Sequence, residues 1–360
     1  MLIAFRCDAT RQVGIGHMAR CAALAEELMR AGHSVLFVTR DTDGLAAGLI
    51  PSQAEIALLA YNPEAHESWN EHAHWLDVGW ETDARWTVEC LRGRSPDWIV
   101  VDHYALDGRW EEKVREGAKH TFVIDDLADR NHVCEVILDQ NLVAAGTRRY
   151  CSRVSAETMC LLGPKYALLR PEFREARIWA QTRVSVDRIM VFLGGGVVES
   201  MVVQGVEALR EGGFSQLWID VVVGAGFGSM EQLESLVAML PNARIHVQTT
   251  CMAELMHSAD LAVGAAGSAT WERASLGLPT VAVAVARNQE PIGEAADDAG
   301  ILEYLGPSER VTTRAISRAV RSLADDPARL SAMSERGHAL VDAGGTIRVR
   351  EFMERYGGEA

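Results

Sequence analysis

The sequence contains no long apolar run and is poor in basic residues relative to acidic ones. No uninterrupted apolar stretch approaches the roughly 20 residues that a helix needs to cross a bilayer, so we expect no membrane span. Lysine and arginine together number 35 against 50 aspartates and glutamates, which gives a formal net charge of −15. This balance argues against nucleic acid or an anionic membrane surface as a partner. It leaves a local cationic pocket open, because net charge says nothing about clustering.

Cysteine is sparse, and its spacing fits neither a disulfide framework nor a zinc site. The chain has seven cysteines, an odd number, and no CxxC pair. Such scattered thiols are typical of proteins in a reducing compartment. Residues 1–8 have no basic segment before their apolar stretch, so they predict a strand that runs into a polar loop rather than a signal peptide. We therefore expect a cytoplasmic protein.

Short apolar runs alternate with helical patterns along almost the whole chain, which is typical of parallel sheets covered by helices. The predicted strands are 2–5, 35–38, 99–101, 121–124, 136–138, 189–193, 217–223, 243–247, 261–263 and 280–285. A chain of 360 residues is too long for one ordinary core. We predict an α/β protein of two Rossmann-like domains that face each other across a cleft, with the ligand at the carboxyl ends of the strands.

Glycine and proline mark the boundary between the two sets of strands. Gly163-Pro164 and Pro171 fall there, within a segment whose charged part reads as a connecting helix or linker. The final residues have a helical pattern, with Pro327 near a helix start and Gly344-Gly345 as a break. The predicted organisation is an N-terminal domain over 1–165, a linker over 166–186, a C-terminal domain over 187–345 and a C-terminal helix over 346–360.

The first predicted strand leads into a glycine-bearing loop that ends in a histidine. Gly14 and Gly16 permit a tight turn and the close approach of a ligand. His17 begins a helix predicted over 17–31, which Gly32 terminates. The helix dipole disfavours a protonated imidazole at this end, so His17 would be a neutral base suited to activating water.

Two other interpretations of this loop stay open from the residues alone. Gly14-x-Gly16-x-x-Ala19 also matches the dinucleotide fingerprint, with Asp41 as the ribose acid. That fingerprint begins directly at the strand end, whereas Gly14 follows a polar loop, so the position disfavours a nicotinamide cofactor. Alternatively, His17 merely caps a helix and the glycines serve a turn.

Polar residues near the first loop and after another strand are candidates for binding the substrate. Asp8 could orient His17 or a substrate group, and Arg6 or Arg20 could face a phosphate. Asp102-His103-Tyr104 follows the strand predicted over 99–101, where a phenol can hydrogen-bond a sugar or a water. Asp102 could instead cap the next helix while Tyr104 packs at the rim of the domain.

Small residues follow the strands of the second domain, where helix N-termini can bind phosphate. Gly194-Gly195-Gly196 and Gly264-Ala265-Ala266-Gly267-Ser268 each lie between a predicted strand and a helix, and Ser268 could cap its helix. Glu272, one turn further, could accept hydrogen bonds from a ribose diol, or simply be solvated. Asn288-Gln289 could bind acetamido groups or a phosphate, or form an ordinary polar turn.

One stretch of the first domain is crowded with aromatic rings. It contains His66, His72, His74, Trp69, Trp75, Trp80 and Trp86. His72 and His74 cannot share a helix face at a spacing of two, which argues against a metal pair. We interpret the stretch as a helical, partly buried aromatic region without a role in the chemistry.

The motifs, taken in order, resemble the nucleotide-sugar hydrolases of pseudaminic acid biosynthesis (PseG). The resemblance rests on Arg6-Cys7-Asp8-Ala9, Gly14-x-Gly16-His17-x-x-Arg20-Cys21, Asp102-His103-Tyr104, Asp125-Asp126, the run from Gly163 to Phe173, Gly194-Gly195 and Asn288-Gln289-Glu290. It spans nearly the whole chain. It implies a two-domain fold of the glycosyltransferase-B type, similar to the peptidoglycan enzyme MurG.

The resemblance also implies an activity. It predicts metal- and cofactor-independent hydrolysis of UDP-2,4-diacetamido-2,4,6-trideoxy-β-L-altropyranose to UDP and the free sugar, with inversion. His17 would be the base that activates water, and Tyr104 would assist near the sugar. The chain departs from the family at Gly196-Val197, where a serine or threonine followed by aspartate is usual. Hydrolysis of another UDP-amino sugar therefore stays open, as do a glycosyltransferase and a binding protein without turnover.

The expected site can be stated in full. The substrate-binding candidates are Arg6, Asp8, Gly14, Gly16, Arg20, Asp102, Asn288 and Gln289, beside the catalytic candidates His17 and Tyr104. The nucleotide-binding candidates are Gly194, Gly195, Gly267, Ser268 and Glu272. No metal site is expected, and we expect a monomer.

Overall fold

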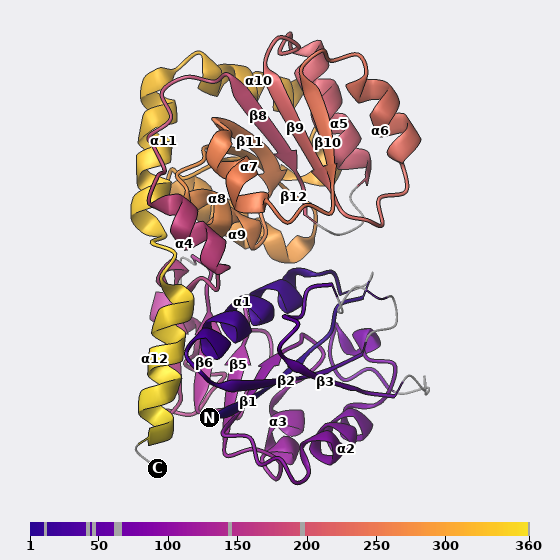
Figure 1. The fold of residues 1–360 in the computed structure, drawn as a ribbon, viewed down its shortest axis with the longest axis vertical. Helices are drawn as coiled ribbons and strands as arrows, with labels where there is room; N and C mark the ends of the chain where they lie inside the picture. The colour runs from indigo at the N-terminus through magenta and orange to yellow at the C-terminus, as the bar shows by residue number, and fades with distance from the viewer. Residues whose placement is uncertain are drawn as a thin grey trace. The chain divides into compact units, whose positions relative to one another are not determined.

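Each half of the chain forms a parallel sheet with helices on both of its faces (Figure 1). The computed structural model describes residues 1–10, 13–40, 44, 48–60, 67–142, 146–194 and 199–358. The chain divides into two compact units, the first taking in Met1–Asn141, Ala145–Arg170 and Gly344–Ala360, and the second Pro171–Ala343. The segment predicted as a linker is thus shared between the units, with its division at Arg170 and Pro171.

The first unit contains a seven-stranded parallel sheet among its described residues. Its strands are β1 (Leu2–Cys7), β2 (Ser34–Thr39), β3 (Glu55–Leu58), β4 (Trp98–Asp102), β5 (His120–Ile124), β6 (Val136–Asp139) and β7 (Met159–Leu162). Its helices are α1 (Gly16–Arg30), α2 (Trp80–Leu91), α3 (Gly108–Val114) and α12 (Gly345–Gly358), with 3-10 turns η1 (Ala73–Trp75), η2 (Gly146–Tyr150) and η3 (Pro164–Tyr166). The strand order is β3-β2-β1-β4-β5-β6-β7.

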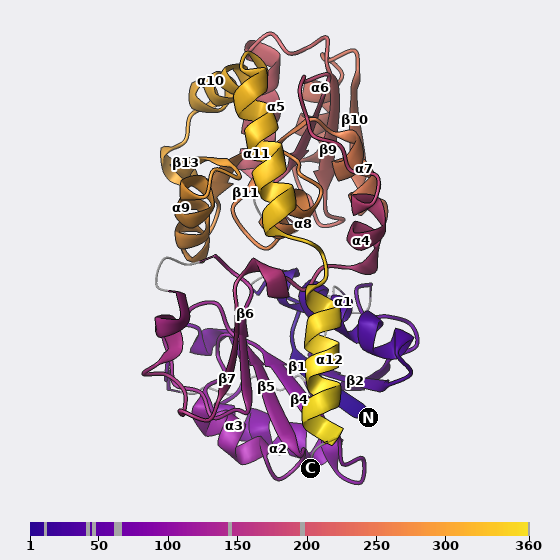
Figure 2. The same ribbon diagram turned by 90° about the vertical axis from the view of Figure 1, so that its left-hand side faces the viewer.

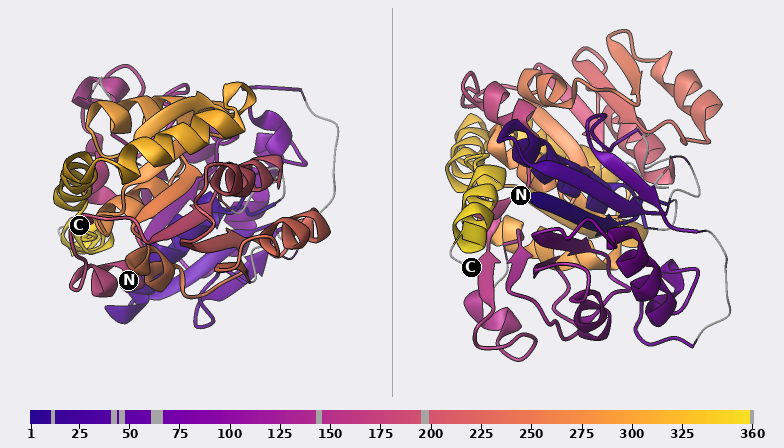
Figure 3. Two further views of the ribbon diagram at one scale, coloured as in Figure 1. Left: turned by 90° about the horizontal axis from the view of Figure 1, so that it is seen from above. Right: turned by 60° about the horizontal axis from the view of Figure 1, so that its bottom comes forward.

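Alternate residues of β1 face opposite sides of this sheet and so enter different cores. Phe5 packs in a cluster with Leu24 of α1 and Met353 of α12. Ala4 packs on the other side, in a cluster with Trp110 of α3. Figure 2 shows α12 beside α1, so the last helix of the chain completes the first unit. The chain's beginning and end lie close together there, as Figure 3 shows.

The second unit contains a six-stranded parallel sheet in the described part of the chain. Its strands are β8 (Arg188–Phe192), β9 (Trp218–Val223), β10 (Ala243–Val247), β11 (Leu261–Ala265), β12 (Thr280–Ala284) and β13 (Glu303–Pro307). Its helices are α4 (Pro171–Arg177), α5 (Glu199–Glu211), α6 (Met230–Val237), α7 (Met252–Ser258), α8 (Ala269–Ser275), α9 (Glu290–Asp298), α10 (Thr313–Ala324) and α11 (Pro327–Leu340), with 3-10 turns η4 (Arg287–Gln289) and η5 (Ser308–Arg310).

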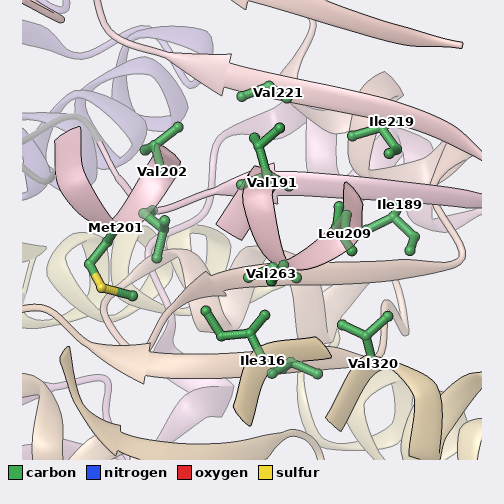
Figure 4. Close-up of a cluster of buried hydrophobic side chains, with 14 of the residues drawn as sticks. Ile189, Val191, Met201, Val202, Leu209, Ile219, Val221, Val263, Ile316 and Val320 are labelled. Atoms are coloured by element: carbon green, nitrogen blue, oxygen red, sulfur yellow. The ribbon is translucent and has the colours of Figure 1, made fainter. Parts of the chain in front are cut away.

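Branched aliphatic side chains hold the second sheet to its helices. Figure 4 shows Val191 of β8 and Val263 of β11 next to Leu209 of α5 and Ile316 of α10. All four are buried. β-Branched residues favour a pleated surface that is covered on both faces, which explains why these strands read as continuous apolar runs.

The order of the strands locates a switch point in each sheet. In the first unit the chain moves from β1 through β2 to β3, then returns to β4 on the other side of β1. In the second it moves from β8 to β10 and returns to β11 beside β8. Loops diverge at such points, outside the carboxyl ends of the strands, and ligands of doubly wound sheets bind there.

The structure confirms each strand predicted from the sequence and adds three. The added strands β3, β7 and β13 lie at sheet edges and carry few buried side chains. β3 (EIAL) and β7 (MCLL) have only four residues each, and β13 (EYLGP) contains a glycine and a proline. The predicted stop of the first helix is confirmed, since Gly32 has a φ of +85°. No helix among the described residues has the length and apolar character to cross a membrane. None of the seven cysteines forms a disulfide.

Candidate active site

His17 lies at the start of α1 and contacts Asp102 at the end of β4. The distance from Nδ1 of His17 to Oδ1 of Asp102 is 2.5 Å. The two meet because β1 and β4 are neighbours, with Cys7 opposite Asp102 in the register. After β1 the chain turns through Gly14, whose φ of +80° favours glycine, and enters the helix at Gly16. It is therefore Asp102, and not Asp8, that orients the histidine.

The polarity of this contact fixes the tautomer of His17. Burial opposes ionisation of Asp102, but the Arg20 guanidinium and His17 hold the pKa of that carboxyl well below its usual range. A carboxylate only accepts hydrogen bonds, so Nδ1 of His17 carries the hydrogen. Nε2 of His17 makes no hydrogen bond within the described residues. In this tautomer the lone pair of the imidazole is on Nε2, which is the atom that a general base would use.

Arg20 joins two carboxylates of the site. Its Nε and Nη2 donate to Asp102 at 2.6 and 2.7 Å, and its Nη1 donates to Asp126 at 2.8 Å. Asp126 also accepts the hydroxyl of Tyr104. Only 6% of the Arg20 side chain is exposed. Arg20 is therefore a buried link between Asp102, which contacts His17, and Asp126, which contacts Tyr104. The structure thus brings together His17, Arg20, Asp102 and Tyr104, which the sequence analysis named separately as candidates.

Asp126 is a site residue that the sequence analysis quoted in a motif but did not assign. It follows β5, the strand next to β4, so its place along the sheet was the available signal. Its neighbour Asp125 has a different partner set, because it is fully buried against Arg130 and His132. Burial opposes the effect, but these cations hold the pKa of Asp125 well below its usual range. The two adjacent carboxylates therefore differ in place: Asp126 belongs to the candidate site, and Asp125 is buried in the core of the first unit.

Aromatic rings form a wall beside His17. The Tyr104 ring meets His17 edge to face, with ring centroids 4.4 Å apart. Trp75 stacks on Tyr104 at 5.3 Å, and His72 meets Tyr104 edge to face at 5.2 Å. The region around Trp75 is partly buried as predicted, and the structure places it against Tyr104 and His17, which the sequence interpretation did not foresee. The contact between Trp75 and Tyr104 could not be predicted from the spacing of the aromatic residues, because it joins η1 to a residue that follows β4.

Arg6 and Asp8 lie in a buried ion-pair network. Arg6 has no exposed surface and donates to Asp8 at 2.6 Å and to Asp83 at 2.8 Å. Arg40 adds a hydrogen bond to Asp83 at 2.5 Å. Burial opposes ionisation, but the guanidinium of Arg6 holds the pKa of Asp8 well below its usual range, and Arg6 and Arg40 lower that of Asp83 to about 2. The guanidinium of Arg6 donates its hydrogen bonds to Asp8 and Asp83, so its role is to stabilise the buried residues beneath the loop that follows β1.

The nucleotide-binding candidates of the second unit gather at one edge of its sheet. Gly194 follows β8, and Gly267 and Ser268 follow β11. The substrate-binding candidates Asn288 and Gln289 follow β12, and these three strands are neighbours. A Cβ on Gly267 would lie 3.1 Å from Nε2 of Gln289, so these two candidates are in contact. Gly195 lies outside the described residues.

Details of this edge differ from the sequence prediction. Ser268 makes no side-chain capping bond, because its φ of −55° and ψ of −32° are already helical, so the predicted cap is wrong. Glu272 is partly buried in the first turn of α8, and Asn288 is exposed. Arg273 was missed: it is buried and donates to the carbonyl of Ala265 at 2.7 Å, which braces the loop after β11. Burial lowers the pKa of Arg273 to about 10.

Metal binding finds no support among the described side chains, since no group of three or more His, Cys, Asp or Glu residues there is placed to hold an ion.

Known proteins resemble the chain in sequence and in fold. No protein-family model matches it. It is 22% identical over 293 residues to UDP-2,4-diacetamido-2,4,6-trideoxy-beta-L-altropyranose hydrolase of Campylobacter jejuni, covering 81% of this chain and 94% of that protein. It is 27% identical over 203 residues to the spore coat polysaccharide biosynthesis protein SpsG of Bacillus subtilis, covering 56% of this chain. The match spans only 60% of the length of SpsG.

The fold has solved counterparts over nearly its full length. MurG of Acinetobacter baumannii superposes with a TM-score of 0.66 at 15% identity, covering 98% of this chain and 99% of that one. With its two doubly wound sheets of seven and six strands, the chain has the glycosyltransferase-B fold. The resemblance indicated by the motifs is supported by these comparisons, since the chain is similar in sequence to the Campylobacter hydrolase over most of its length and similar in fold to MurG.

Proposed function

We propose that this protein is an enzyme that hydrolyses a UDP-linked amino sugar and releases UDP and the free sugar with inversion. The substrate we propose is a 2,4-diacetamido-2,4,6-trideoxyhexose of the L-altrose type, as the name of the Campylobacter relative indicates. The observation that carries the proposal is the contact of His17 with Asp102, which leaves Nε2 of His17 as a base. Hydrolysis needs such a base to deprotonate water.

In the proposed reaction a water attacks the anomeric carbon as the bond from that carbon to UDP breaks. His17 takes one proton of the water on Nε2, and the electron pair of the broken bond leaves with UDP. Asp102 stabilises the imidazolium that forms, as the carboxylate does in serine-hydrolase triads. Attack from the face opposite UDP gives inversion. The buried Arg20 keeps Asp102 ionised for this purpose.

We propose that UDP binds at the carboxyl edge of the second sheet. Gly194, Gly267 and Ser268 lie there, after neighbouring strands, and Gln289 packs against Gly267. Loops of small residues at this edge let backbone N–H groups approach a diphosphate. Glu272, in the first turn of α8, is the proposed acceptor for the ribose hydroxyls. The protein is further proposed to act as a monomer in the cytoplasm and without a metal or cofactor.

Two related activities are alternatives that experiment can separate. The first is hydrolysis of a different UDP-amino sugar, motivated by Gly196-Val197, which departs from the family and lies outside the described residues. The second is sugar transfer to an acceptor, motivated by the likeness to MurG. A panel of UDP-amino sugars, scored for UDP release without any acceptor, tests both. Release from the diacetamido-trideoxy sugar alone supports the proposal, and no release from any of them refutes it.

The base can be tested with a matched pair of variants. We expect His17→Leu to lower kcat by about 10²- to 10⁴-fold, the usual contribution of a general base. UDP affinity, measured by calorimetry, should stay within about twofold, since the proposed nucleotide site is in the other unit. His33→Leu is the control, because His33 lies just past the far end of α1 and contacts Glu354 instead. Wild-type turnover in His17→Leu would show that the base is misassigned.

The bond that breaks can be established with oxygen-18 water. Attack at carbon places the label in the free sugar, which is the expected result. Label in UDP would mean attack at phosphorus and would contradict the proposed step, although the enzyme would still be a hydrolase.

A further inference from the structure

Arg273 of α8 is a buried arginine whose hydrogen-bond partners are all uncharged. Only 2% of the residue is exposed. Its Nε donates to the hydroxyl of Thr280 at 3.1 Å, and its Nη2 donates to the carbonyl of Ala265 at 2.7 Å and to the hydroxyl of Thr270 at 3.3 Å. Nη1 has no hydrogen-bond partner in the described part of the chain. The guanidinium therefore keeps its full charge and an unused donor inside the second unit.

No carboxylate of the described residues is paired with this charge. Arg273 forms no ion pair there, in contrast to Arg20, which pairs with two carboxylates. Burial lowers the pKa of Arg273 to about 10, and the charge of its neighbour Glu272 offsets this effect only in part, so the side chain is charged near neutral pH. The residues of the second unit outside the described ranges, 143–144 and 195–198, include no aspartate or glutamate. A buried charge without a counter-charge is costly, so we expect a ligand to supply one.

The guanidinium lies where β8 and β11 end beside each other. Its Nη2 donates to Ala265, the last residue of β11. A Cβ on Gly264 would lie 2.7 Å from Nη1 of Arg273 and 3.2 Å from the carbonyl oxygen of Phe192, the last residue of β8. Gly264 thus leaves the space that the guanidinium occupies. The loops after these same two strands carry the residues at which we propose that UDP binds.

We propose that Arg273 is the buried counter-charge of the diphosphate, a positioning residue that makes the second unit prefer a charged nucleotide to an uncharged nucleoside without the help of a metal ion. This inference rests on the proposed function and adds a residue to its nucleotide site. Arg273 acts in two ways. It holds the backbone of the loop after β11 through the carbonyl of Ala265, and its charge acts on the ligand from below that loop.

The expected effect follows from the depth of the charge. Buried charges are screened by water and salt much less than exposed ones. At an effective dielectric constant of about 20, one pair of opposite unit charges about 8 Å apart changes an affinity by about 30-fold. A diphosphate carries more than one negative charge, whereas uridine carries none. The ratio of UDP affinity to uridine affinity should therefore depend on Arg273, and not only the affinity for UDP.

Two variants of similar length separate charge from hydrogen bonding. Arg273→Met and Arg273→Lys both lose the planar set of donors, but lysine keeps a positive charge. A lowering of the pKa as large as that of Arg273 leaves a lysine charged at about pH 6.5, where the affinities are measured in EDTA, by calorimetry for UDP and by NMR titration for uridine. We expect the UDP-to-uridine ratio to fall at least about tenfold in Arg273→Met and to stay within about threefold of wild type in Arg273→Lys. A purely structural role would weaken both ligands alike and leave the ratio unchanged.

Arg183 provides the matched control, because it is also a buried arginine without an ion pair among the described residues. It is 6% exposed, and burial lowers its pKa. Each of its nitrogen atoms donates to a backbone carbonyl, among them His257 at 2.9 Å near the end of α7, where the helix dipole offsets a positive charge. Arg183 contacts the segment that leads into β11, at the amino edge of the sheet, opposite the proposed nucleotide site. Arg183→Met should lower the free energy of unfolding but leave the UDP-to-uridine ratio within about twofold of wild type.

The outcomes separate this inference from the proposed function. An unchanged ratio in Arg273→Met, or an equal fall in Arg183→Met, would overturn the counter-charge while leaving the hydrolase and its base intact. If Arg273→Met does not fold, Gly264→Ala takes its place, because the added Cβ displaces Nη1, and an unchanged ratio there would also overturn the inference.

The wild-type protein gives a test that needs no variant. We expect its preference for UDP over uridine to be present in EDTA and to stay the same when Mg²⁺ is added. A preference that appears only with Mg²⁺ would overturn the inference, because the metal would then be the counter-charge. If the wild type shows the preference that depends on Arg273 but releases no UDP from any UDP-sugar, the proposed hydrolysis fails and the nucleotide site stands. No binding of UDP would refute both.

Discussion

Replacing Asp102 by asparagine removes a charge from the site while keeping the shape of the side chain. Asp102 has no exposed surface and accepts hydrogen bonds from Nδ1 of His17 and from Nε and Nη2 of Arg20. An asparagine amide can turn its N–H₂ toward His17, which moves the ring hydrogen from Nδ1 to Nε2. The lone pair needed for water is then lost.

The size of the effect follows from these contacts. Forcing the wrong tautomer in a serine-hydrolase triad lowers kcat by about 10⁴-fold, so we expect kcat to fall by about 10³- to 10⁴-fold here. Stability should also fall, because Arg20 is 6% exposed and loses one of its two carboxylates. Breaking a buried pair costs about 3–5 kcal/mol, and Asp126 retains part of the pairing, so we expect a loss of about 3 kcal/mol.

The assay must separate lost chemistry from lost stability, and Asp83→Asn provides the matched control. Asp83 is equally buried and accepts from Arg6, Arg40 and Trp110, but it has no contact with His17. We expect Asp83→Asn to lose a similar unfolding free energy in urea while kcat falls less than tenfold. UDP affinity should stay near the wild-type value in both variants.

The reasoning would be refuted if the two variants lost kcat to the same extent, since the loss at Asp102 would then be a consequence of destabilisation. It would also be refuted if Asp102→Asn kept more than about a tenth of the wild-type kcat. A double variant with His17→Leu gives a further check. If Asp102 acts only through His17, the double variant should be no slower than His17→Leu alone.

Three further predictions concern other parts of the chain. Burial and the Asp126 carboxylate raise the pKa of Asp139 to about 7, so its folded form binds a proton more tightly than the unfolded chain. Its contribution to stability is then fully present below about pH 4 and is lost as the pH rises through about 7. Asp139→Asn should therefore reduce the fall in the free energy of urea unfolding over this range by up to about 4 kcal/mol, and an unchanged fall would contradict the shift. Gly264→Ala should lower the free energy of urea unfolding by about 1–3 kcal/mol and weaken UDP binding, because the added Cβ would lie 2.7 Å from Nη1 of the buried Arg273. Wild-type stability would show that the Arg273 side chain moves aside without cost. Trp75→Leu should lower kcat/KM about tenfold, because it removes the ring stacked on Tyr104, and Trp75→Phe should keep most of the wild-type kcat/KM. Equal kinetics in the two variants would show that the aromatic ring at this position does not contribute to the site.

The sheets were predictable where the sequence carried a strong apolar signal. The strands around 99–101 and 261–263 are buried on both faces, so nearly every residue in them is apolar or small. The three missed strands lie at sheet edges and give a weak signal for another reason: β3 and β7 have only four residues each, and β13 has a glycine and a proline among its five. Edge strands are recognised by their backbone pairing, which the order of side chains does not encode directly.

The site was predictable as a set of residues but not as a set of pairs. Gly14, His17 and Tyr104 could be singled out because they follow strands at the carboxyl edge of a parallel sheet. Of the two roles left open for Asp8, the orientation of His17 is excluded, because Asp8 instead joins the buried ion pairs of Arg6. The order of the strands decides which carboxylate contacts the imidazole of His17. It is Asp102, because β4 lies directly beside β1.

By itself the sequence determined the repeating strand–helix pattern, the turn at Gly14, and the residue types that chemistry at a sugar would need. These are local properties, set by backbone conformation and by the burial that each short segment requires. Only the tertiary structure decided that Asp102 orients His17, that Arg20 joins Asp102 to Asp126, and that the ring of Trp75 reaches the site. The physical reason is that hydrogen-bond partners far apart in the chain are selected by packing of the whole sheet, whose strand order no single segment specifies.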